Sequence, residues 1–263
     1  MDALTLGMPP AGLRGKVAIV TGVSRHQGIG AAICRAFASC GVDIVFTHWQ
    51  AFDRETAYGA DEDGPALIEL ELGNQGIRVE SLEVDLSSSD APRQILGVTV
   101  ERLGMPSILV NNAAHDSPGG ILELDASVLD RHYAVNVRGM VLLCAEFVRR
   151  YPGGPGGRII NLSSGQALTP MPQSLAYATT KGAVEAFTFS LAVEVASKGI
   201  TVNAVDPGGT DTGWMTEELR SDLTRQMGMG RVGQPEDAAR LITFLASEAG
   251  GWITGQVIHS RGA

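Results

Sequence analysis

The chain has little of what several protein classes require. It has three cysteines, Cys34, Cys40 and Cys144, without CxxC spacing, so we predict reduced core thiols rather than disulfides or a zinc site. Its 20 Lys and Arg are dispersed and outnumbered by 29 Asp and Glu, which excludes the clustered basic surface of a nucleic-acid-binding protein. The apolar run 140–148 is interrupted by Glu146 and is far shorter than the ~20 residues of a membrane span.

The composition that remains is that of a globular enzyme. Hydrophobic residues make up 44% and charged residues 19% of 263 residues, enough to bury a full core. No linker rich in Pro, Gly and Ser and no internal repeat divides the chain, so we predict an N-terminal tail at 1–14 and one domain at 15–263. Because the tail lacks the basic start and apolar run of a signal peptide, a cytoplasmic location is expected.

Apolar, β-branched runs alternate with helix-compatible segments along the whole chain. The predicted strands are 16–21, 42–47, 78–84, 107–111, 158–162, 200–205 and 256–259. Strands that alternate with crossover helices form a parallel sheet with helices on both faces. The predicted fold is therefore α/β, a doubly wound, seven-stranded parallel sheet.

Two segments read as insertions at the ligand-binding edge of this sheet. The segment 49–65 is acidic and turn-rich and follows the second strand, and 211–230 is rich in Met and follows the sixth. Both are expected at the carboxyl edge, where open α/β sheets bind ligands. The second is predicted to be a lid.

A glycine-rich turn joins the first strand to a helix predicted at 31–38. Glycines let the backbone approach a pyrophosphate, and the free N–H groups at the start of a helix favour an anion. Its position directly after a strand favours dinucleotide binding over a simple strand end. The residues expected to contact the cofactor here are Gly22, Ser24, Arg25, Gly28, Ile29 and Gly30.

The form of the cofactor depends on the residues after the second strand. An NAD-selective site usually has an acidic residue there, but this chain has Thr47-His48-Trp49. Arg25 and Arg54 could meet a 2′-phosphate, so NADP(H) is preferred; NAD(H) stays open because both arginines could equally be solvated. Further cofactor contacts are predicted at Asp85 and Leu86, for the adenine, and at Asn112, Ala113 and Ala114, for the ribose, although a plain turn also explains Asp85.

The strongest signal for catalysis is Ser164 followed by Tyr177 and Lys181. Tyr177 and Lys181 are four residues apart, so on a helix they share one face. A phenol has an ordinary pKa near 10, and a nearby ammonium stabilises its phenolate, which would make Tyr177 a usable acid and base. A lone YxxxK occurs by chance, but here it accompanies a strand that ends in Ser163-Ser164 and a glycine turn.

At this point the sequence resembles the short-chain dehydrogenase/reductase family, and is similar to its 3-oxoacyl-acyl-carrier reductase-like members. The resemblance covers 13–262 and rests on Thr21, Gly22, Gly28, Ile29, Gly30, Asp85, Asn111, Asn112, Ala113, Ala114, Asn136, Ser164, Tyr177, Lys181, Pro207, Gly208 and Thr212. It implies a Rossmann fold and the interconversion of a secondary alcohol and a ketone by hydride transfer with a nicotinamide cofactor.

The resemblance also implies a role for each catalytic candidate. Tyr177 would pass a proton to or from the substrate oxygen, and Ser164 would hydrogen-bond the same oxygen. Lys181 would bind the nicotinamide ribose and tune Tyr177, which also lies against the cofactor. Asn136 would hold a water that links Lys181 to solvent.

The loop after the sixth strand resembles the family's carboxamide-binding loop. The cofactor contacts expected there are Pro207, Gly208, Thr210 and Thr212, although a simple Pro-Gly turn is the alternative. The chain departs from the family in two ways. Gly22 and Gly28 enclose five residues rather than three, and Ala114 replaces the usual glycine.

Three functions stay open at this level. The first is a general alcohol/ketone oxidoreductase acting on a small molecule, with selectivity set by 115–117, 166–173 and an apolar lid wall. The lid wall consists of Trp214, Met215, Met227 and Met229. The second is a β-ketoacyl thioester reductase that meets an acidic carrier protein through Arg149, Arg150 and Lys198. The third is a catalytically silent nucleotide sensor, which would be expected to have lost Tyr177 or Lys181.

The partners expected are few. No metal, nucleic acid or membrane is predicted. The resemblance implies a homo-oligomer, a dimer or tetramer, that pairs the helices predicted at 125–150 and 174–198.

Overall fold

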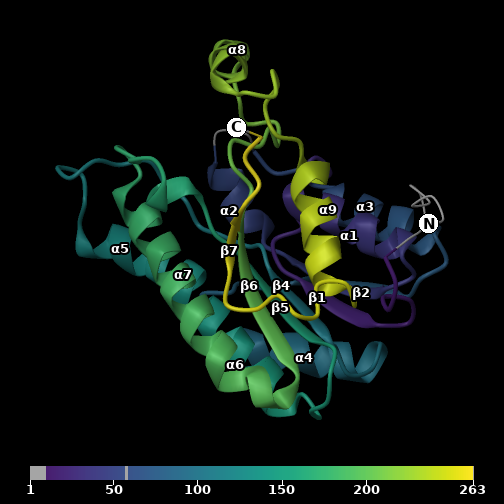
Figure 1. The fold of residues 1–263 in the computed structure, drawn as a ribbon. Coiled ribbons are helices and arrows are strands. Elements are labelled where there is room, and N and C mark those ends of the chain that lie inside the picture. The colour runs from purple at the N-terminus through teal and green to yellow at the C-terminus, as the bar shows by residue number, and fades with distance from the viewer. Residues whose placement is uncertain (1–9, 57–58, 263) are drawn as a thin grey trace.

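The computed structural model describes residues 10–56 and 59–262, which form one seven-stranded parallel sheet (Figure 1). The strand order is β3-β2-β1-β4-β5-β6-β7, and every neighbouring pair is parallel. The bounds are β1 Val17–Val20, β2 Asp43–His48, β3 Val79–Glu83, β4 Ile108–Asn111, β5 Gly157–Leu162, β6 Ile200–Asp206 and β7 Val257–His259. The doubly wound prediction is confirmed, and the order reverses between β1 and β4, where such sheets bind ligands.

Helices cover both faces of the sheet. Their bounds are α1 Ile29–Ser39, α2 Gln50–Glu55, α3 Gly64–Gly73, α4 Ala91–Arg102, α5 Ala126–Tyr133, α6 Met140–Arg150, α7 Leu175–Val195, α8 Glu217–Gln226 and α9 Pro235–Ala246. One buried cluster joins α1, α3 and α9 to the sheet, and a second joins α4, α6 and α7. Along β1, Ala18 and Val20 belong to the first cluster and Ile19 to the second, as side chains that alternate along a doubly covered strand must.

The predicted helix 125–150 is interrupted by a π-helical turn, Ala134–Gly139, between α5 and α6. Gly139 lies against the loop that follows β3. A Cβ on Gly139 would collide with the carbonyl oxygen of Leu86 in that loop. A π-helical turn inserted in a helix often marks a functional position. Here it carries Asn136.

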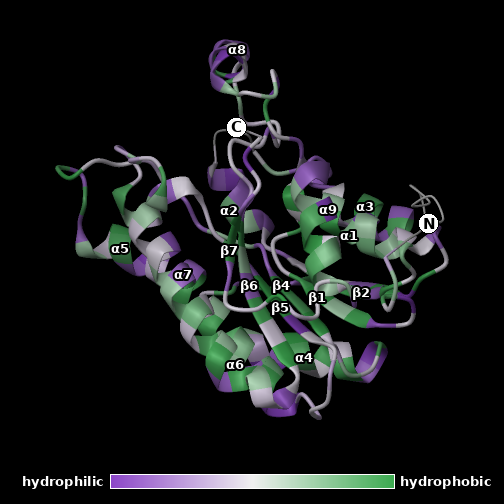
Figure 2. Cartoon of the chain, viewed as in Figure 1, coloured by the Kyte–Doolittle hydropathy of each residue, from purple (hydrophilic) through white to green (hydrophobic). Residues whose placement is uncertain are grey.

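The two predicted insertions do lie at the carboxyl edge. The described part of 49–65 contains α2 and leads into α3, and 211–230 contains α8. Helix α8 buries none of its residues and stands clear of the rest of the molecule (Figure 1). It is also hydrophilic, whereas the central strands are hydrophobic (Figure 2).

The N-terminal tail predicted at 1–14 is only partly described, because 1–9 lie outside the described residues. Leu13 is fully buried in the first cluster, so the packed body begins inside the predicted tail. Cys34, Cys40 and Cys144 are buried free thiols. None of the described helices combines the length and apolar character that crossing a membrane requires.

Candidate active site

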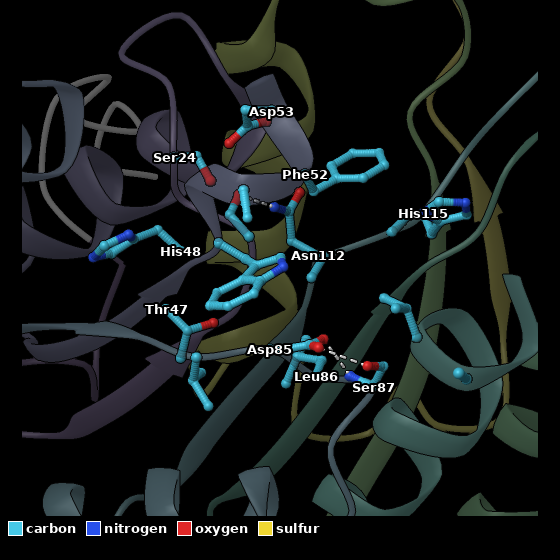
Figure 3. A pocket seen from close by; sticks show the side chains of 18 of the residues that line it. Ser24, Thr47, His48, Phe52, Asp53, Asp85, Leu86, Ser87, Asn112 and His115 are labelled. Atoms are coloured by element: carbon cyan, nitrogen blue, oxygen red, sulfur yellow. Dashed lines mark hydrogen bonds between the residues drawn. The ribbon is translucent and has the colours of Figure 1, made fainter. Parts of the chain in front are cut away.

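A cleft of about 950 Å³ lies along the carboxyl edge, at the point where the strand order reverses (Figure 3). Its walls come from the loops after β1, β2, β3 and β4, from α2 and α5, and from Thr212 after β6. The predicted cofactor residues that line it are Gly22, Ser24, Arg25, Gly28, Ile29, Asp85, Leu86, Asn112, Ala113, Ala114 and Thr212. Gly30, Pro207, Gly208, Thr210, Tyr177 and Lys181 are not among its lining residues.

The glycines of the phosphate turn are required by close backbone approaches. Gly22 has a φ of +74°, and a Cβ there would lie 2.6 Å from the Cα of Ala113. A Cβ on Gly30 would lie 2.7 Å from the Gly22 carbonyl oxygen. Gly28 is the N-cap of α1, where no side chain caps the helix, so its first N–H groups are available to an anion.

Asn112 and Asp85 shape the floor of the cleft mainly through bonds to the backbone. The Asn112 side-chain amide donates to the carbonyl oxygens of Thr21, at 2.9 Å, and Gly22, at 2.8 Å. It therefore ties the end of β4 to the end of β1. The Asp85 carboxylate accepts hydrogen bonds from the Ser87 N–H and hydroxyl, at 2.8 and 2.7 Å (Figure 3). Asp85 thus forms a turn while it lines the cleft.

Helix α2 and the residue before it line the cleft with side chains that sequence reasoning missed, among them Trp49, Phe52 and Asp53. Asp53 is 6% exposed, and its Oδ2 has no hydrogen-bond partner within the described residues. Burial raises the pKa of Asp53, against the opposing effects of Ser24 and Arg25. The Phe52 ring reaches toward His115 across the cleft, with 5.0 Å between ring centroids (Figure 3). The position of the insertion was predictable, but which of its side chains turn inward was not.

The catalytic candidates from β5 and α7 meet at the end of β5. The Ser164 hydroxyl interacts with the Tyr177 phenol, and it donates to the Met171 sulfur at 3.9 Å. The Lys181 ammonium nitrogen lies 5.3 Å from the centroid of the Tyr177 ring and donates to the Leu162 carbonyl oxygen at 2.7 Å. The four-residue spacing on one helix face therefore brings the three side chains together.

The electrostatics of this cluster differ from the sequence expectation. Burial raises the pKa of Tyr177, and the carboxylates of Asp116 and Asp206 raise it further, against the hydrogen bond from Ser164. Burial also lowers the pKa of Lys181 to about 8, against the effect of Asp116. The expected lowering of the phenol pKa by the ammonium is not seen, because desolvation of Tyr177 is the largest influence on its pKa and raises it.

Asn136 connects this cluster to the loop after β4. Its side-chain amide donates to the His115 carbonyl oxygen at 2.8 Å and to the Thr180 hydroxyl at 3.0 Å. Its Oδ1 accepts from the His115 N–H at 2.6 Å. Asn136 is 3% exposed, so it holds the loop against α7 beside Lys181.

The loop after β6 is fixed by its own hydrogen bonds. The Gly208 N–H donates to Asp206 at 2.9 Å, and the Thr210 hydroxyl donates to the Pro207 carbonyl oxygen at 3.0 Å. Gly208 has a φ of +66°, which favours glycine there. The loop leads directly to Thr212 at the cleft.

Known proteins resemble this chain over nearly its whole length. A family model described as enoyl-(acyl carrier protein) reductase matches residues 22–262. The uncharacterized oxidoreductase YjdA of Bacillus subtilis is 50% identical over 249 residues, which are 94% of this chain and 96% of YjdA. A solved short-chain dehydrogenase/reductase of Serratia marcescens has a TM-score of 0.83 at 34% identity and covers 94% of this chain and 96% of its own.

The chain belongs to the short-chain dehydrogenase/reductase family. It is an NAD(P)-dependent oxidoreductase of that family. A further member, a short-chain dehydrogenase of Burkholderia cenocepacia solved in complex with NADP, has a TM-score of 0.85 at 31% identity. The match covers 95% of this chain and 98% of the Burkholderia chain.

Within this short-chain dehydrogenase, the two arginines considered for a 2′-phosphate are engaged elsewhere. Arg25 lines the cleft and bonds the carbonyl oxygen of Thr212 at 3.1 Å and its hydroxyl at 3.2 Å. Arg54 pairs with Glu62 at 2.7 Å, and both side chains are exposed. Arg54 is not among the residues that line the cleft. The case for a phosphate-binding arginine therefore rests on Arg25 alone.

A group of polar side chains from the loop after β4, from α5 and from the turn after β5 lies near the catalytic candidates. His132 is fully buried, contacts the His115 ring edge-on with 4.6 Å between centroids, and accepts the Ser117 N–H at 3.2 Å. Asp116 lies 3.9 Å from His132, and burial raises its pKa. Gln166, beside Ser164 in sequence, has a buried amide with no partner in the described part of the chain. Both ring nitrogens of His132 are engaged, the second with the Val128 carbonyl oxygen at 2.8 Å, so His132 holds this region together from inside.

The remaining sequence hypotheses concern charges. Arg149 and Arg150 pair with Glu146, at 3.6 and 2.7 Å, so neither forms an isolated basic patch for an acidic carrier. Within residues 10–56 and 59–262, no three His, Cys, Asp or Glu side chains gather where they could hold a metal ion.

Proposed function

We propose that this protein interconverts a secondary alcohol and a ketone by hydride transfer, with Tyr177 as the proton donor and acceptor. The observation that carries the proposal is the meeting of Ser164, Tyr177 and Lys181 at the end of β5, in a chain of the short-chain dehydrogenase/reductase family. The raised pKa of Tyr177 keeps the phenol protonated, which suits donation to a carbonyl oxygen.

A nicotinamide dinucleotide fits the cleft. The close approach of Gly22 to Ala113 and the uncapped start of α1 at Gly28 leave backbone N–H groups where a pyrophosphate would be held. Asp85, Leu86 and Ala113 would contact the adenosine half. When bound, the cofactor supplies the hydride or accepts it.

The chain's own residues would supply the remaining chemistry. Ser164 would donate a hydrogen bond to the substrate oxygen, where negative charge develops during reduction. Tyr177 would pass its proton to the same oxygen. Lys181 would bind the ribose next to the nicotinamide, and Asn136 would keep the loop after β4 in contact with α7 and hold a water for proton exchange.

The preferred cofactor is NADP(H). The NADP bound by the similar Burkholderia protein supports this preference. The buried Asp53 opposes it, because a carboxylate in this wall repels a phosphate. Thermal unfolding with equal concentrations of each cofactor is the test, and we expect a larger rise in Tm with NADP(H). An equal rise with NAD(H) would remove the preference.

A homo-oligomer is expected from the family resemblance. Phe189 and Val193 on α7 are 66% and 75% exposed in the single chain, which supports burial against a second copy. Light scattering is the measurement that checks this expectation. A monomer at micromolar concentration would contradict it.

The main test is turnover by the wild-type protein and the Tyr177→Phe variant. Oxidation of NADPH with a panel of ketones is followed by absorbance. We expect the variant to lose roughly 10²- to 10⁴-fold in rate while it keeps most of its cofactor affinity, since the ring stays and only the hydroxyl group is removed. Full activity in the variant would contradict the assigned chemistry.

A further inference from the structure

The widened phosphate turn, residues 22–28, contacts the base of the lid, residues 211–214. Arg25 lies in the turn after β1, and Thr212 lies 187 residues further along the chain, after β6. The Arg25 guanidinium donates one hydrogen bond to the Thr212 carbonyl oxygen, at 3.1 Å, and a second to its hydroxyl, at 3.2 Å. A guanidinium that bonds two atoms of one residue fixes both its position and its orientation.

The length of the turn makes this reach possible. Five residues separate Gly22 from Gly28, two more than the family pattern, and they include Arg25, His26 and Gln27. The Gln27 side chain also lies against the lid base, beside Gly213. Its Oε1 lies 3.0 Å from where a Cβ on Gly213 would be. Two side chains of the turn thus contact two consecutive residues of the lid base.

The other side of the turn is fixed to the body of the protein. Arg35 on α1 donates to the His26 carbonyl oxygen at 2.9 Å and pairs with Glu71 on α3 at 2.7 Å. The His26 ring lies 3.1 Å from the same carboxylate. A turn held in this way to α1 and α3 gives Arg25 a stable base.

The lid is also attached at its two ends, where the Asp211 N–H donates to the Gly233 carbonyl oxygen at 2.9 Å and the Met229 N–H to the Gly262 carbonyl oxygen at 3.1 Å, and Met215 is buried. Thr212 is followed by α8, none of whose residues is buried. Within the lid base, Asp211 accepts the Gly213 N–H at 3.0 Å and pairs with Arg220 at 2.7 Å, and the Trp214 indole donates to Thr210 at 3.1 Å. These bonds join the lid to itself and to the segments around Gly233 and Gly262, whereas Arg25 and Gln27 connect its base to the phosphate turn.

We propose that Arg25 is a positioning residue that holds Thr212, and with it the base of the lid, against the phosphate turn. This inference rests on the proposed function in one respect, since Thr212 is there the residue that contacts the nicotinamide carboxamide. The bond spans from the pyrophosphate end of the cleft to the nicotinamide end. Arg25 therefore couples the binding of the cofactor to the order of the lid, whichever nicotinamide cofactor is bound.

The alternative role for Arg25 is to bind a 2′-phosphate, and the two roles predict different results. A residue that positions Thr212 matters equally for NAD(H) and NADP(H). A phosphate-binding residue matters only for NADP(H). A comparison of the two cofactors in one variant therefore separates the roles.

The experiment compares the wild-type protein with Arg25→Ala and with a matched control, Arg93→Ala. Arg93 lies on α4, is exposed and pairs only loosely with Asp90, at 3.6 Å. The first readout is hydrogen–deuterium exchange of the cofactor-free protein. We expect exchange in 211–220 to be roughly five- to tenfold faster in Arg25→Ala, as the loss of a charged hydrogen bond implies, and unchanged in the control.

The second readout is the dissociation constant of each cofactor. We expect Arg25→Ala to weaken NAD(H) and NADP(H) by the same factor, roughly five- to tenfold. Arg25→Lys keeps the charge but not the two-pronged geometry, and we expect it to restore little of the exchange protection.

Two outcomes would overturn the proposal. One is unchanged exchange in 211–220 in Arg25→Ala. The other is a loss of affinity confined to NADP(H), which would make Arg25 a phosphate-binding residue. If the wild-type protein turned over no alcohol or ketone, the proposed function would fail, yet the exchange measurement would still decide the role of Arg25.

Discussion

The catalytic cluster and the outer wall of the cofactor cleft lie at the same edge of one sheet but are built from different material. Ser164 follows a fully buried strand, and Tyr177 and Lys181 lie on the 21-residue helix α7. The outer wall comes from the six-residue helix α2 and from the lid base beside the exposed α8. The cluster is therefore positioned by the core, and the wall by a few long-range side-chain bonds.

This difference teaches where chemistry and selectivity reside. Side chains on long, packed elements keep the fixed geometry that proton transfer requires. Loops at the rim tolerate insertion and vary in sequence, so they are suited to the choice of cofactor and substrate. Substitutions in the cluster should therefore change the rate, and substitutions in the wall should change binding and order.

After Tyr177→Phe, the largest expected effect in this comparison comes from Ser164→Ala. Loss of the hydroxyl that bonds the substrate oxygen should lower turnover roughly 10²- to 10³-fold, as the loss of a donor to a developing oxyanion does. The matched control is Ser163→Ala, because Ser163 bonds Glu185 at 2.6 Å rather than Tyr177. That control should lose stability and keep most of its turnover. Equal losses of turnover in the two variants would contradict the role of Ser164.

Replacement of Lys181 should change how stability depends on pH. Its folded pKa of about 8 lies below the ordinary 10.5, so between these values the unfolded chain binds a proton that the folded protein has released. The free energy of unfolding of the wild type should therefore rise with pH in this window, by up to about 1.4 kcal/mol per pH unit.

In Lys181→Met this rise in the free energy of unfolding should be absent. The stability of the variant relative to the wild type should therefore be highest at pH 7 and should fall toward pH 10. Chemical denaturation at several pH values measures the difference between the two proteins. Parallel pH profiles would show that Lys181 is not a desolvated ammonium.

A smaller effect on stability is expected at the π-helical turn behind the cluster. Gly139→Ala places a methyl group against the Leu86 carbonyl oxygen and should lower the free energy of unfolding by about 1–3 kcal/mol. Gly182→Ala on α7 is the control, since nothing lies within 4 Å of its Cβ position. It should be neutral or stabilise by up to ~1 kcal/mol. Equal thermal stability of the two variants would mean that the backbone at Gly139 is not tightly packed.

The smallest effect is expected in the cleft wall, at Asp53. Its raised pKa means that the folded protein holds a proton at pH values where the unfolded chain has released it, so stability falls as pH rises through that window. Asp53→Asn removes this loss and should raise Tm at neutral pH by about 2 °C, with a smaller gain near pH 4. A lower Tm at neutral pH would show that the Asp53 carboxylate is needed by the fold.

The sequence predicted those features that depend on local pattern. The seven strands lie within two residues of their predicted bounds, because buried parallel strands are continuous apolar runs. The meeting of Tyr177 with Ser164 followed from a helical spacing and a strand end. These features depend on residues that are close together in the chain.

What the sequence did not predict depends on contacts between distant segments. The break at Ala134–Gly139 requires the approach of Gly139 to Leu86, and the engagement of Arg25 requires a partner 187 residues away. The inward turn of Asp53 depends on how α2 packs against Ser24. The raised pKa of Tyr177 was not predicted because its main causes, burial and the approach of Asp116, are set by the fold.

The central claim is that hydride moves between the nicotinamide and a substrate carbon while Tyr177 passes the proton. The direct test follows deuterium from 4-deuterated NADPH into the alcohol product by NMR, for the wild type and Tyr177→Phe at equal cofactor saturation. The account predicts label at the carbinol carbon with the wild type and a rate lower by roughly 10²-fold or more with the variant. Transfer at the wild-type rate in Tyr177→Phe, or an alcohol product without label, would contradict it.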